Sequence, residues 1–208
     1  DNYWGTSRGN HEVKMRDTFA NNRMRNEMAP GKEAEYTKIY PEEEVLPVYD
    51  AVVEYKKRGT DLVIIGGKEY GTGSSRDWAA KGTKLLGVKA VIAESFERIH
   101  RSNLIGMGIL PLQFTNDVNR KNLNLIGSEL ISVLDVEKGI NPSDEVTLEI
   151  KYASGDIKKV KTLCRIDTKN ELAKKTNSEV IPADATNIED LENLINTATN
   201  KFGGKLDF

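Results

Sequence analysis

The chain has 208 residues, of which 30 are lysine or arginine and 32 are aspartate or glutamate, so its formal net charge is −2. This balance argues against a protein that holds nucleic acid by overall positive charge, and no apolar run reaches the roughly 20 residues of a membrane-spanning helix. The single cysteine, Cys164, excludes an internal disulfide, a cysteine-ligated zinc site and an iron–sulfur cluster held by this chain alone.

The first part of the sequence predicts an arm followed by alternating helices and strands. Residues 1–46 are polar, and we expect a mostly irregular arm with one short helix. Apolar residues from Val48 to Tyr55 have helical spacing, which ends at Gly59. The pattern then predicts a strand at 62–65, a helix at 75–86, a strand at 88–93, a helix capped by Ser95 and a strand at 109–114. Strands connected through helices in this way predict a parallel sheet with right-handed crossovers.

Residues 115–168 predict a different architecture. Segments 130–136, 146–152 and 158–166 have β character, and the turn residues 153–156 predict a hairpin between the last two. We therefore expect an α/β fold: a layered domain with a mostly parallel central sheet and an additional small antiparallel sheet.

The first residues carry no signal-peptide pattern, so we expect a cytoplasmic protein that does not contact a membrane.

The segment 66–77, GGKEYGTGSSRD, contains the residues best suited to bind a ligand. It follows a buried strand and begins a helix, the position at which open α/β sheets bind ligands. Backbone amides and the helix dipole favour an anion there, and Arg76 can grip a carboxylate through two hydrogen bonds. The order of residues excludes a P-loop, a dinucleotide fingerprint and a hydrolase elbow. A glycine-rich turn capped by serine is the structural alternative.

Three longer runs carry a resemblance to a known family. They are GKEYGTGSSRDWAAKG at 67–82, AESFERIHRSNL at 93–104 and GILPLQ at 108–113. Together with SRGNHEV at 7–13 and TFAN at 18–21, they resemble the C-terminal swivel domain of aconitase, in the long type that includes the iron-regulatory proteins. The resemblance covers residues 3–172 and implies a swivelling β/β/α layered domain.

The resemblance implies a hydro-lyase that interconverts citrate and isocitrate through cis-aconitate. In that family the first serine of the Gly-Ser-Ser-Arg motif is the base, which here is Ser74. Ser75 and Arg76 then align with substrate-binding positions, and Arg8 aligns with an arginine that binds a substrate carboxylate. Arginine forks suit a tricarboxylate, and surrounding positive charge lowers the pKa of an alkoxide base.

The family's 4Fe–4S cluster is held by cysteines of the preceding domains, so the resemblance implies cluster-bearing partner domains and no cluster bound by this chain alone. An isolated chain is then expected to be inactive. Cys164 matches no cluster motif and is expected to be a small core residue. His100 is expected to be structural, and His11 is a weak candidate near the Arg8 block.

The match stops near Leu172, which divides the chain into an aconitase-like domain, 1–172, and a tail, 173–208. The tail resembles an internal piece of short-chain dehydrogenases, including enoyl-acyl-carrier reductases, at Asp184-Ala185-Thr186 and at FGGKLDF, 202–208. It lacks their glycine-rich loop and their tyrosine–lysine pair, so we assign it no reductase activity. We interpret the chain as a gene fragment, a fusion or a mis-joined reading frame, with a lineage-specific tail as the alternative.

An inert remnant that folds without function stays open at this point, as do two functional alternatives to a catalytic aconitase domain. One is a small subunit of the isopropylmalate isomerase type, although the Trp78–Gly82 segment and the Arg8 block favour aconitase. The other is a regulatory RNA-binding module like that of the iron-regulatory proteins, which the near-neutral charge makes the weaker of the two.

Overall fold

The computed structural model describes residues 15–16, 18–19, 25–32, 35–73, 77–134, 136, 139–168 and 171. All of them belong to the first of two units of the chain, Asp1–Thr176. In chain order, the elements are β1 (Tyr36–Ile39), β2 (Glu44–Pro47), α3 (Val48–Lys57), β3 (Leu62–Ile65), α4 (Asp77–Leu85), β4 (Val88–Ala93), α5 (Arg98–Gly106), β5 (Leu110–Phe114), β6 (Leu130–Val133), β7 (Glu145–Lys151) and β8 (Ile157–Cys164). None of the helices in these ranges has the length and apolar character needed to cross a membrane.

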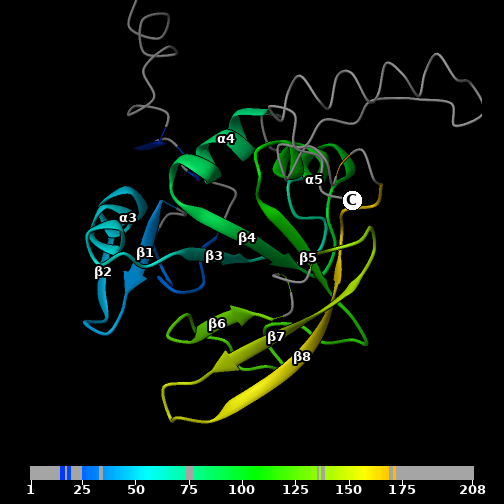
Figure 1. Cartoon of the computed structure of the whole chain (residues 1–208). Coiled ribbons are helices and arrows are strands. Elements are labelled where there is room, and N and C mark those ends of the chain that lie inside the picture. Colours follow the sequence, from blue (N-terminus) through cyan, green and yellow to red (C-terminus); the bar gives the residue numbers. More distant parts are fainter. Residues whose placement is uncertain are drawn as a thin grey trace, which may run out of the picture. The chain divides into compact units, whose positions relative to one another are not determined.

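A six-stranded mixed sheet with the strand order β3-β4-β5-β8-β7-β6 organises the described unit (Figure 1). β3, β4 and β5 are parallel, as the sequence predicts. β8 pairs antiparallel with β5, and β7 and β6 continue the same sheet in antiparallel pairs. The prediction of a mostly parallel sheet, with the later strands in a sheet of their own, is therefore wrong. The free edge of β5 offers unpaired backbone groups, and β8 satisfies them directly.

The chain does contain a small antiparallel sheet, but it lies within the segment expected to be an irregular arm. β1 and β2 pair with one another along their length, so the prediction of an irregular arm over residues 1–46 is wrong at 36–39 and 44–46. Ile39 at the end of β1 is 2% exposed. The phenol oxygen of Tyr55 in α3 accepts a hydrogen bond from the backbone nitrogen of Tyr40 at 2.9 Å. A contact with a later helix thus supports this hairpin, and a local pattern does not reveal such a contact.

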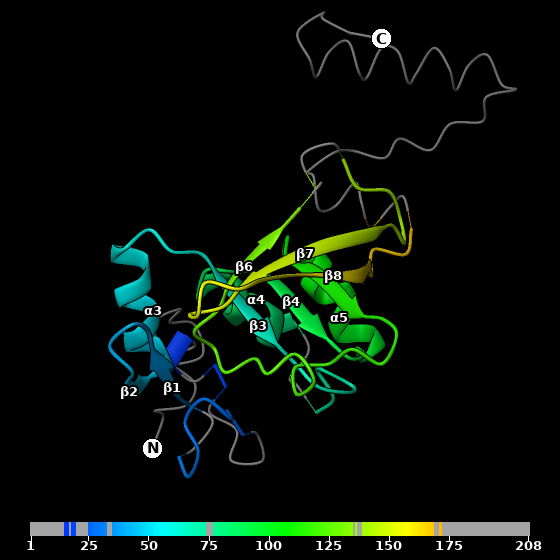
Figure 2. The ribbon, with the colours of Figure 1, turned by 90° about the horizontal axis from the view of Figure 1, so that it is seen from below.

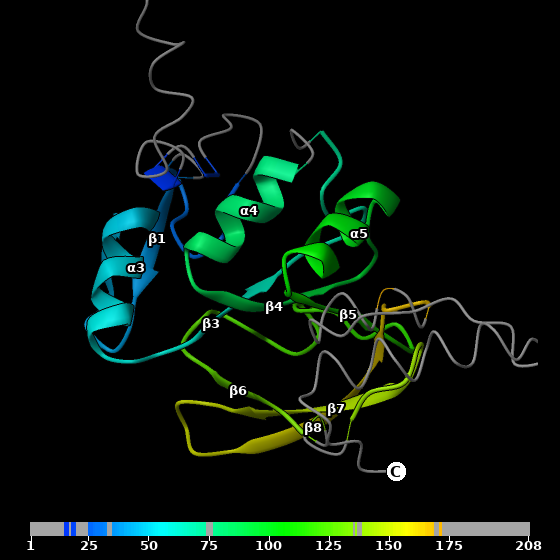
Figure 3. The ribbon, with the colours of Figure 1, turned by 45° about the horizontal axis from the view of Figure 1, so that its top comes forward.

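Two apolar clusters pack against β4. Val91 belongs to a cluster with Ala80 of α4 and Leu104 of α5, and Figure 3 shows these two helices lying along the same side of β4 and β5. Ile92, the next residue, belongs to a second cluster that includes Leu148 of β7. Figure 2, seen from below, shows β7 and β8 in front of β4 and β5, on the side opposite to the helices that Figure 1 shows above these strands. Because successive strand residues point to opposite faces, β4 is buried on both sides from Ala90 to Ala93 and is continuously apolar over these residues, whereas Lys89 is exposed.

Candidate functional site

All four sequence-predicted site residues, Arg8, Ser74, Ser75 and Arg76, lie outside the described residues. The structure nevertheless describes both ends of the segment that carries the last three, because Gly73 precedes Ser74 and α4 follows Arg76. The preceding residues 66–73, called the site loop below, follow the carboxyl end of β3. Ligands of open α/β sheets bind at this edge, so the described frame lies where the sequence predicts it.

The backbone of the site loop is hydrogen-bonded to the segment that follows β4. Tyr70 and Phe96 form an isolated parallel bridge beyond the ends of the two strands. The bonds run from Gly66 N to Ile92 O (2.8 Å), from Glu94 N to Gly67 O (3.1 Å), from Tyr70 N to Ser95 O (2.9 Å) and from Glu97 N to Tyr70 O (2.9 Å). They continue the β3–β4 pairing past the sheet edge, so the loop that leads to Ser74 has a fixed backbone path.

Side chains reinforce this path at Glu69 and Ser95. The Ser95 hydroxyl accepts a hydrogen bond from the backbone nitrogen of Glu69 at 2.7 Å and donates one to its Oε1 at 3.0 Å. Thr72 closes the following turn, because its backbone nitrogen and its hydroxyl both donate to the carbonyl of Glu69, at 3.1 and 2.8 Å. Glu69 is thereby held at φ 51°, a left-handed conformation that is unusual for a residue with a side chain.

The ring of Tyr70 contacts two aromatic side chains of the β4–α5 region. It meets Phe96 edge to face, with ring centroids 6.1 Å apart, and the imidazole of His100 in a tilted arrangement at 5.4 Å. Such pairs add stability beyond the apolar area that they bury. Burial also raises the pKa of the Tyr70 phenol, so the group stays protonated at neutral pH. Tyr70 therefore fixes the site loop to the apolar cluster that contains Val91 and Leu104, through aromatic contacts.

Glu97, and not Ser95, caps α5, so the predicted cap is wrong by two positions. The Glu97 carboxylate accepts hydrogen bonds from the backbone nitrogens of Ile99 (3.0 Å) and His100 (2.7 Å). These bonds lower the pKa of the Glu97 carboxyl. The amides at the start of α5 thus bind the chain's own carboxylate, and the hydroxyl of Ser95 serves the site loop instead.

The described part of the N-terminal arm lies against α3 and α4. A Cβ at Gly82 of α4 would overlap the side-chain oxygen of Thr18, so the two segments are in close contact. The guanidinium carbon of Arg16 lies 4.2 Å from the centre of the Tyr49 ring of α3. Arg8 precedes this docked segment, and α4 begins directly after Arg76. The contact at Thr18 therefore places this described part of the arm against the helix that follows the site loop.

Two large apolar side chains are exposed at the starts of the helices that follow β3 and β4. Trp78 of α4 is 41% exposed and Ile99 of α5 is 50% exposed. The ammonium nitrogen of Lys81 lies 4.8 Å from the centre of the Trp78 ring. Both helices start at the carboxyl edge of the sheet, so this edge combines the site loop with apolar surface.

The lone thiol does not fit an iron–sulfur centre. Cys164 lies in β8 with 0% exposure and belongs to the apolar cluster of β4, β5 and β7. Iron–sulfur clusters are held by several cysteine thiolates, and the sequence supplies one. No set of three or more histidine, cysteine, aspartate or glutamate side chains within the described ranges could hold a metal ion. His11 lies outside those ranges.

The sequence alone does not reveal that four residues support the site loop, namely Glu69, Tyr70, Glu97 and His100. One signal was present, since an aromatic residue between small residues in a glycine-rich loop often packs against a neighbouring element. No sequence signal marks Glu97 as the cap of α5, because serine is a more common capping residue than glutamate and Ser95 lies two positions earlier.

Comparisons with known proteins give a consistent family. Residues 1–117 match the model of the aconitase C-terminal domain. Aconitate hydratase A of Legionella pneumophila is 59% identical over 86% of this chain and 20% of its own length. The enzyme of the same name from Pseudomonas aeruginosa is 57% identical over 82% of this chain and 19% of its own, and that from Escherichia coli is 53% identical over 86% and 20%. The chain thus spans about a fifth of the length of these curated relatives.

A solved structure, 3-isopropylmalate dehydratase from Methanocaldococcus jannaschii, aligns with a TM-score of 0.37 and 17% identity. The alignment covers 89% of this chain and 90% of the isopropylmalate dehydratase chain. The family model covers more than half of the chain, and the curated relatives above are 53% to 59% identical to most of it. The chain therefore belongs to the aconitase C-terminal domain family.

Proposed function

We propose that this domain supplies the carboxylate-binding and base-bearing part of an aconitate hydratase, which interconverts citrate and isocitrate through cis-aconitate. The observation that carries the proposal is the 59% identity to an aconitate hydratase A over 86% of the chain, including the site loop. The names of these relatives do not favour an isopropylmalate isomerase subunit or an RNA-binding module.

In the proposed reaction, the ionised oxygen of Ser74 takes a proton from the carbon next to a substrate carboxylate and becomes a neutral hydroxyl. The electron pair of the broken C–H bond forms the C=C bond of cis-aconitate as hydroxide leaves the neighbouring carbon, and hydration reverses these steps. Ser74, Ser75 and Arg76 connect the fixed end of the site loop to the start of α4, where backbone amides and the helix dipole favour negative charge. The same field lowers the pKa of a hydroxyl that must ionise. Arg76 and Arg8 bind the carboxylates through paired hydrogen bonds, and Ser75 adds a donor.

The family's 4Fe–4S cluster would be held by other domains of the complete enzyme and would act there on the substrate hydroxyl. The single buried thiol of this chain does not fit the cluster, and no step of the proposed reaction in this chain passes through it. We also propose that the cluster-bearing domains are its partners. The exposed Trp78 and Ile99 at the site edge support this, since they offer apolar surface for another domain.

We further propose that the described unit is the swivelling β/β/α layer of that enzyme. The helices α4 and α5 on one side of β4, and the strands β7 and β8 on the other, support this layering. Residues 173–208 lie outside the described residues, and their foreign origin stays a proposal. Sequencing the locus tests it, because an uninterrupted gene for a functional enzyme that encodes this junction would overturn it. The expected cytoplasmic location stays a prediction.

Mixing the purified chain with the cluster-bearing region of the Legionella pneumophila relative tests the proposed activity. We expect hydration of cis-aconitate, measured by the loss of its absorbance, to depend on both components. Ser74→Ala should lower the rate by about 10³-fold or more, whereas Ser132→Ala, at an exposed serine of β6, should leave it unchanged. A mixture in which both proteins are folded and associated but no hydration occurs would overturn the proposal.

A further inference from the structure

Helix α5 is held from two sides by adjacent residues. His100 packs against the site loop, and Arg101 binds the segment that follows β8. Both side chains are almost fully buried, with residue exposures of 2% and 7%. Neighbouring residues of a helix point in directions about 100° apart, so the two contacts reach different parts of the molecule. The helix is therefore in a position to fix one of these parts relative to the other.

The contact with the site loop is between the His100 side chain and the backbone of Gly71. A Cβ at Gly71 would overlap the Cβ, Cγ and Cδ2 atoms of His100, so the His100 side chain lies directly against this backbone. Gly71 has φ +100°, a conformation that side chains disfavour, so the close approach and the turn both require glycine. The imidazole also contacts the ring of Tyr70, the residue before Gly71, at 5.4 Å.

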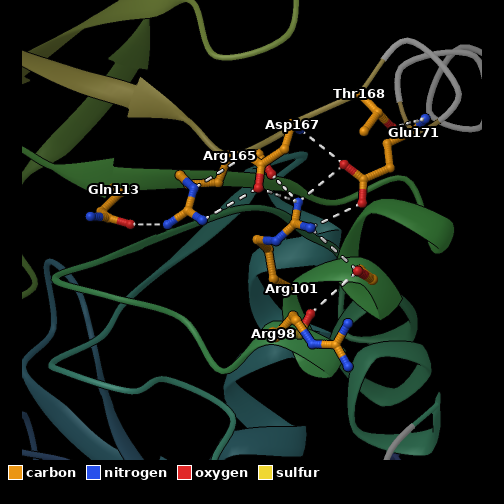
Figure 4. Close-up of polar contacts among 8 residues, drawn as sticks. Arg98, Arg101, Gln113, Arg165, Asp167, Thr168 and Glu171 are labelled. Carbon is orange, nitrogen blue, oxygen red and sulfur yellow. Dashed lines mark hydrogen bonds and ion pairs between the residues drawn. The ribbon is translucent and has the colours of Figure 1, made fainter.

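The contact on the other side is an ion-pair cluster around Arg101 (Figure 4). The Arg101 guanidinium donates to both carboxylate oxygens of Glu171, at 3.0 and 3.1 Å, and to the carbonyl of Arg165 at 2.6 Å. The Asp167 carboxylate lies 3.5 Å away, and its backbone nitrogen donates to Glu171. A paired, mostly buried carboxylate and guanidinium hold a fixed geometry better than an exposed pair does. The cluster thus anchors α5 to the end of the sheet.

We infer that His100 is a positioning residue for the reaction: its imidazole sets the position of the Gly71–Gly73 turn, and thereby of Ser74, while the Arg101 cluster holds α5 still. This inference rests on the proposed function for its kinetic consequence, but the structural part of it stands on the contacts above. His100 touches neither substrate nor reacting atoms in this role. It acts through the backbone of Gly71, which is followed within three residues by the proposed base.

Such a positioning role affects the rate, because the rate depends strongly on the distance between the base and the substrate. A displacement of about 1 Å in a reacting group lowers a rate by about 10²-fold. The loop has a fixed path up to Tyr70, where the last backbone bonds to the β4–α5 segment are made. Past that point, the two bonds from Thr72 to the Glu69 carbonyl close the turn, and Gly71 contacts the His100 side chain of α5. Removing the imidazole therefore loosens the packing of this turn against α5 and leaves the earlier part of the loop in place.

Two substitutions of His100 separate this role from a general loss of packing. Asparagine keeps a Cβ, a Cγ and a planar amide at the three atom positions that contact Gly71, whereas alanine keeps the Cβ alone. Glu171→Gln is the matched control, because it removes a charge on the other side of the same helix, while the Arg165 carbonyl and Asp167 still hold Arg101 in place. All three variants are compared with the full chain for their urea unfolding midpoints.

The first readout is the backbone amide spectrum of the ¹⁵N-labelled full chain. We expect the Gly71 and Gly73 signals to shift in His100→Ala, to stay near their original positions in His100→Asn and to be unchanged in Glu171→Gln. The second readout is the turnover of the mixture with the cluster-bearing region. There His100→Ala should lower kcat by about 10- to 100-fold, and His100→Asn should stay within about threefold of the original chain.

A merely structural role predicts that kcat follows stability, so that His100→Ala and Glu171→Gln lose activity in proportion to their unfolding midpoints. That outcome would overturn the inference, as would unshifted loop signals in His100→Ala or a His100→Asn variant as impaired as the alanine variant. If the original chain supports no turnover at all, the proposed function fails, and the spectra alone decide whether His100 positions the loop.

Discussion

The Ser95 hydroxyl lies 2.7 Å from the backbone nitrogen of Glu69 and 3.0 Å from its Oε1, so one side chain accepts from and donates to the same residue. Residue 95 follows β4, and residue 69 lies in the loop after β3. The pair therefore ties together two loops at the sheet edge that carries the proposed site.

Ser95→Ala should lower the free energy of unfolding by about 1 kcal/mol, because the Glu69 amide loses its acceptor. The exchange of that amide with solvent should become faster, while the amides of β7 remain as protected as before. Urea unfolding and hydrogen exchange measure the two effects. The exposed Ser132 of β6 provides the control, and an equal loss in Ser132→Ala would contradict the role given to Ser95.

Gly71→Ala and Gly73→Ala form a second matched pair. Both glycines have positive φ, +100° and +79°, but a Cβ at Gly73 would meet nothing within 4 Å, whereas one at Gly71 would overlap His100. Alanine should cost about 1–2 kcal/mol at Gly73 for its conformation alone, and about 1–3 kcal/mol more at Gly71 for the overlap. Equal unfolding midpoints for the two variants would show that the contact with His100 is not tight.

Gly82→Ala should loosen the N-terminal arm from α4. Alanine normally stabilises a helix by about 1 kcal/mol relative to glycine, but here its methyl group would overlap Thr18. We expect limited proteolysis to cleave Gly82→Ala faster within residues 15–32. Adding Thr18→Ala removes the overlapping oxygen and should slow the cleavage again. Gly106→Ala, in α5 with open space around it, should not change the pattern.

The Glu97 cap should make stability depend on pH. Two amide hydrogen bonds lower the pKa of this carboxyl in the folded chain below its ordinary value of 4.5. A depressed pKa means that the stabilisation is fully present above pH 4.5 and is lost as the pH falls through the folded pKa. Glutamine accepts the same bonds without titrating. The stability difference between the original chain and Glu97→Gln should therefore be constant above about pH 7.5, where the neighbouring His100 is neutral, and should change most strongly below about pH 4.5, where Glu97 is protonated.

The sequence predicts the strands β3, β4 and β5 and the helices between them because their signals are local: buried apolar runs and glycine stops. The cap of α5 was missed because Ser95 suits a cap by type but is used by Glu69, a choice made through tertiary contact. Tertiary contact also decides the place of β8, because its sequence pattern predicts a strand but does not predict that it pairs with β5. The site residues Arg8, Ser74, Ser75 and Arg76 come from the family motif, and they stay predictions.

The pairing of β5 with β8 has a consequence for how this chain acquires its fold. Three residue pairs, Leu112 with Cys164, Gln113 with Leu163 and Phe114 with Thr162, join the parallel half of the sheet to the antiparallel half. A nascent chain that has emerged only as far as β7 presents β5 as an open edge, available to any other strand. Proteolytic trimming or circular permutation that separates β8 from β5 should therefore promote aggregation, even though the site loop follows β3, at one edge of the sheet, and β5 and β8 pair in its middle.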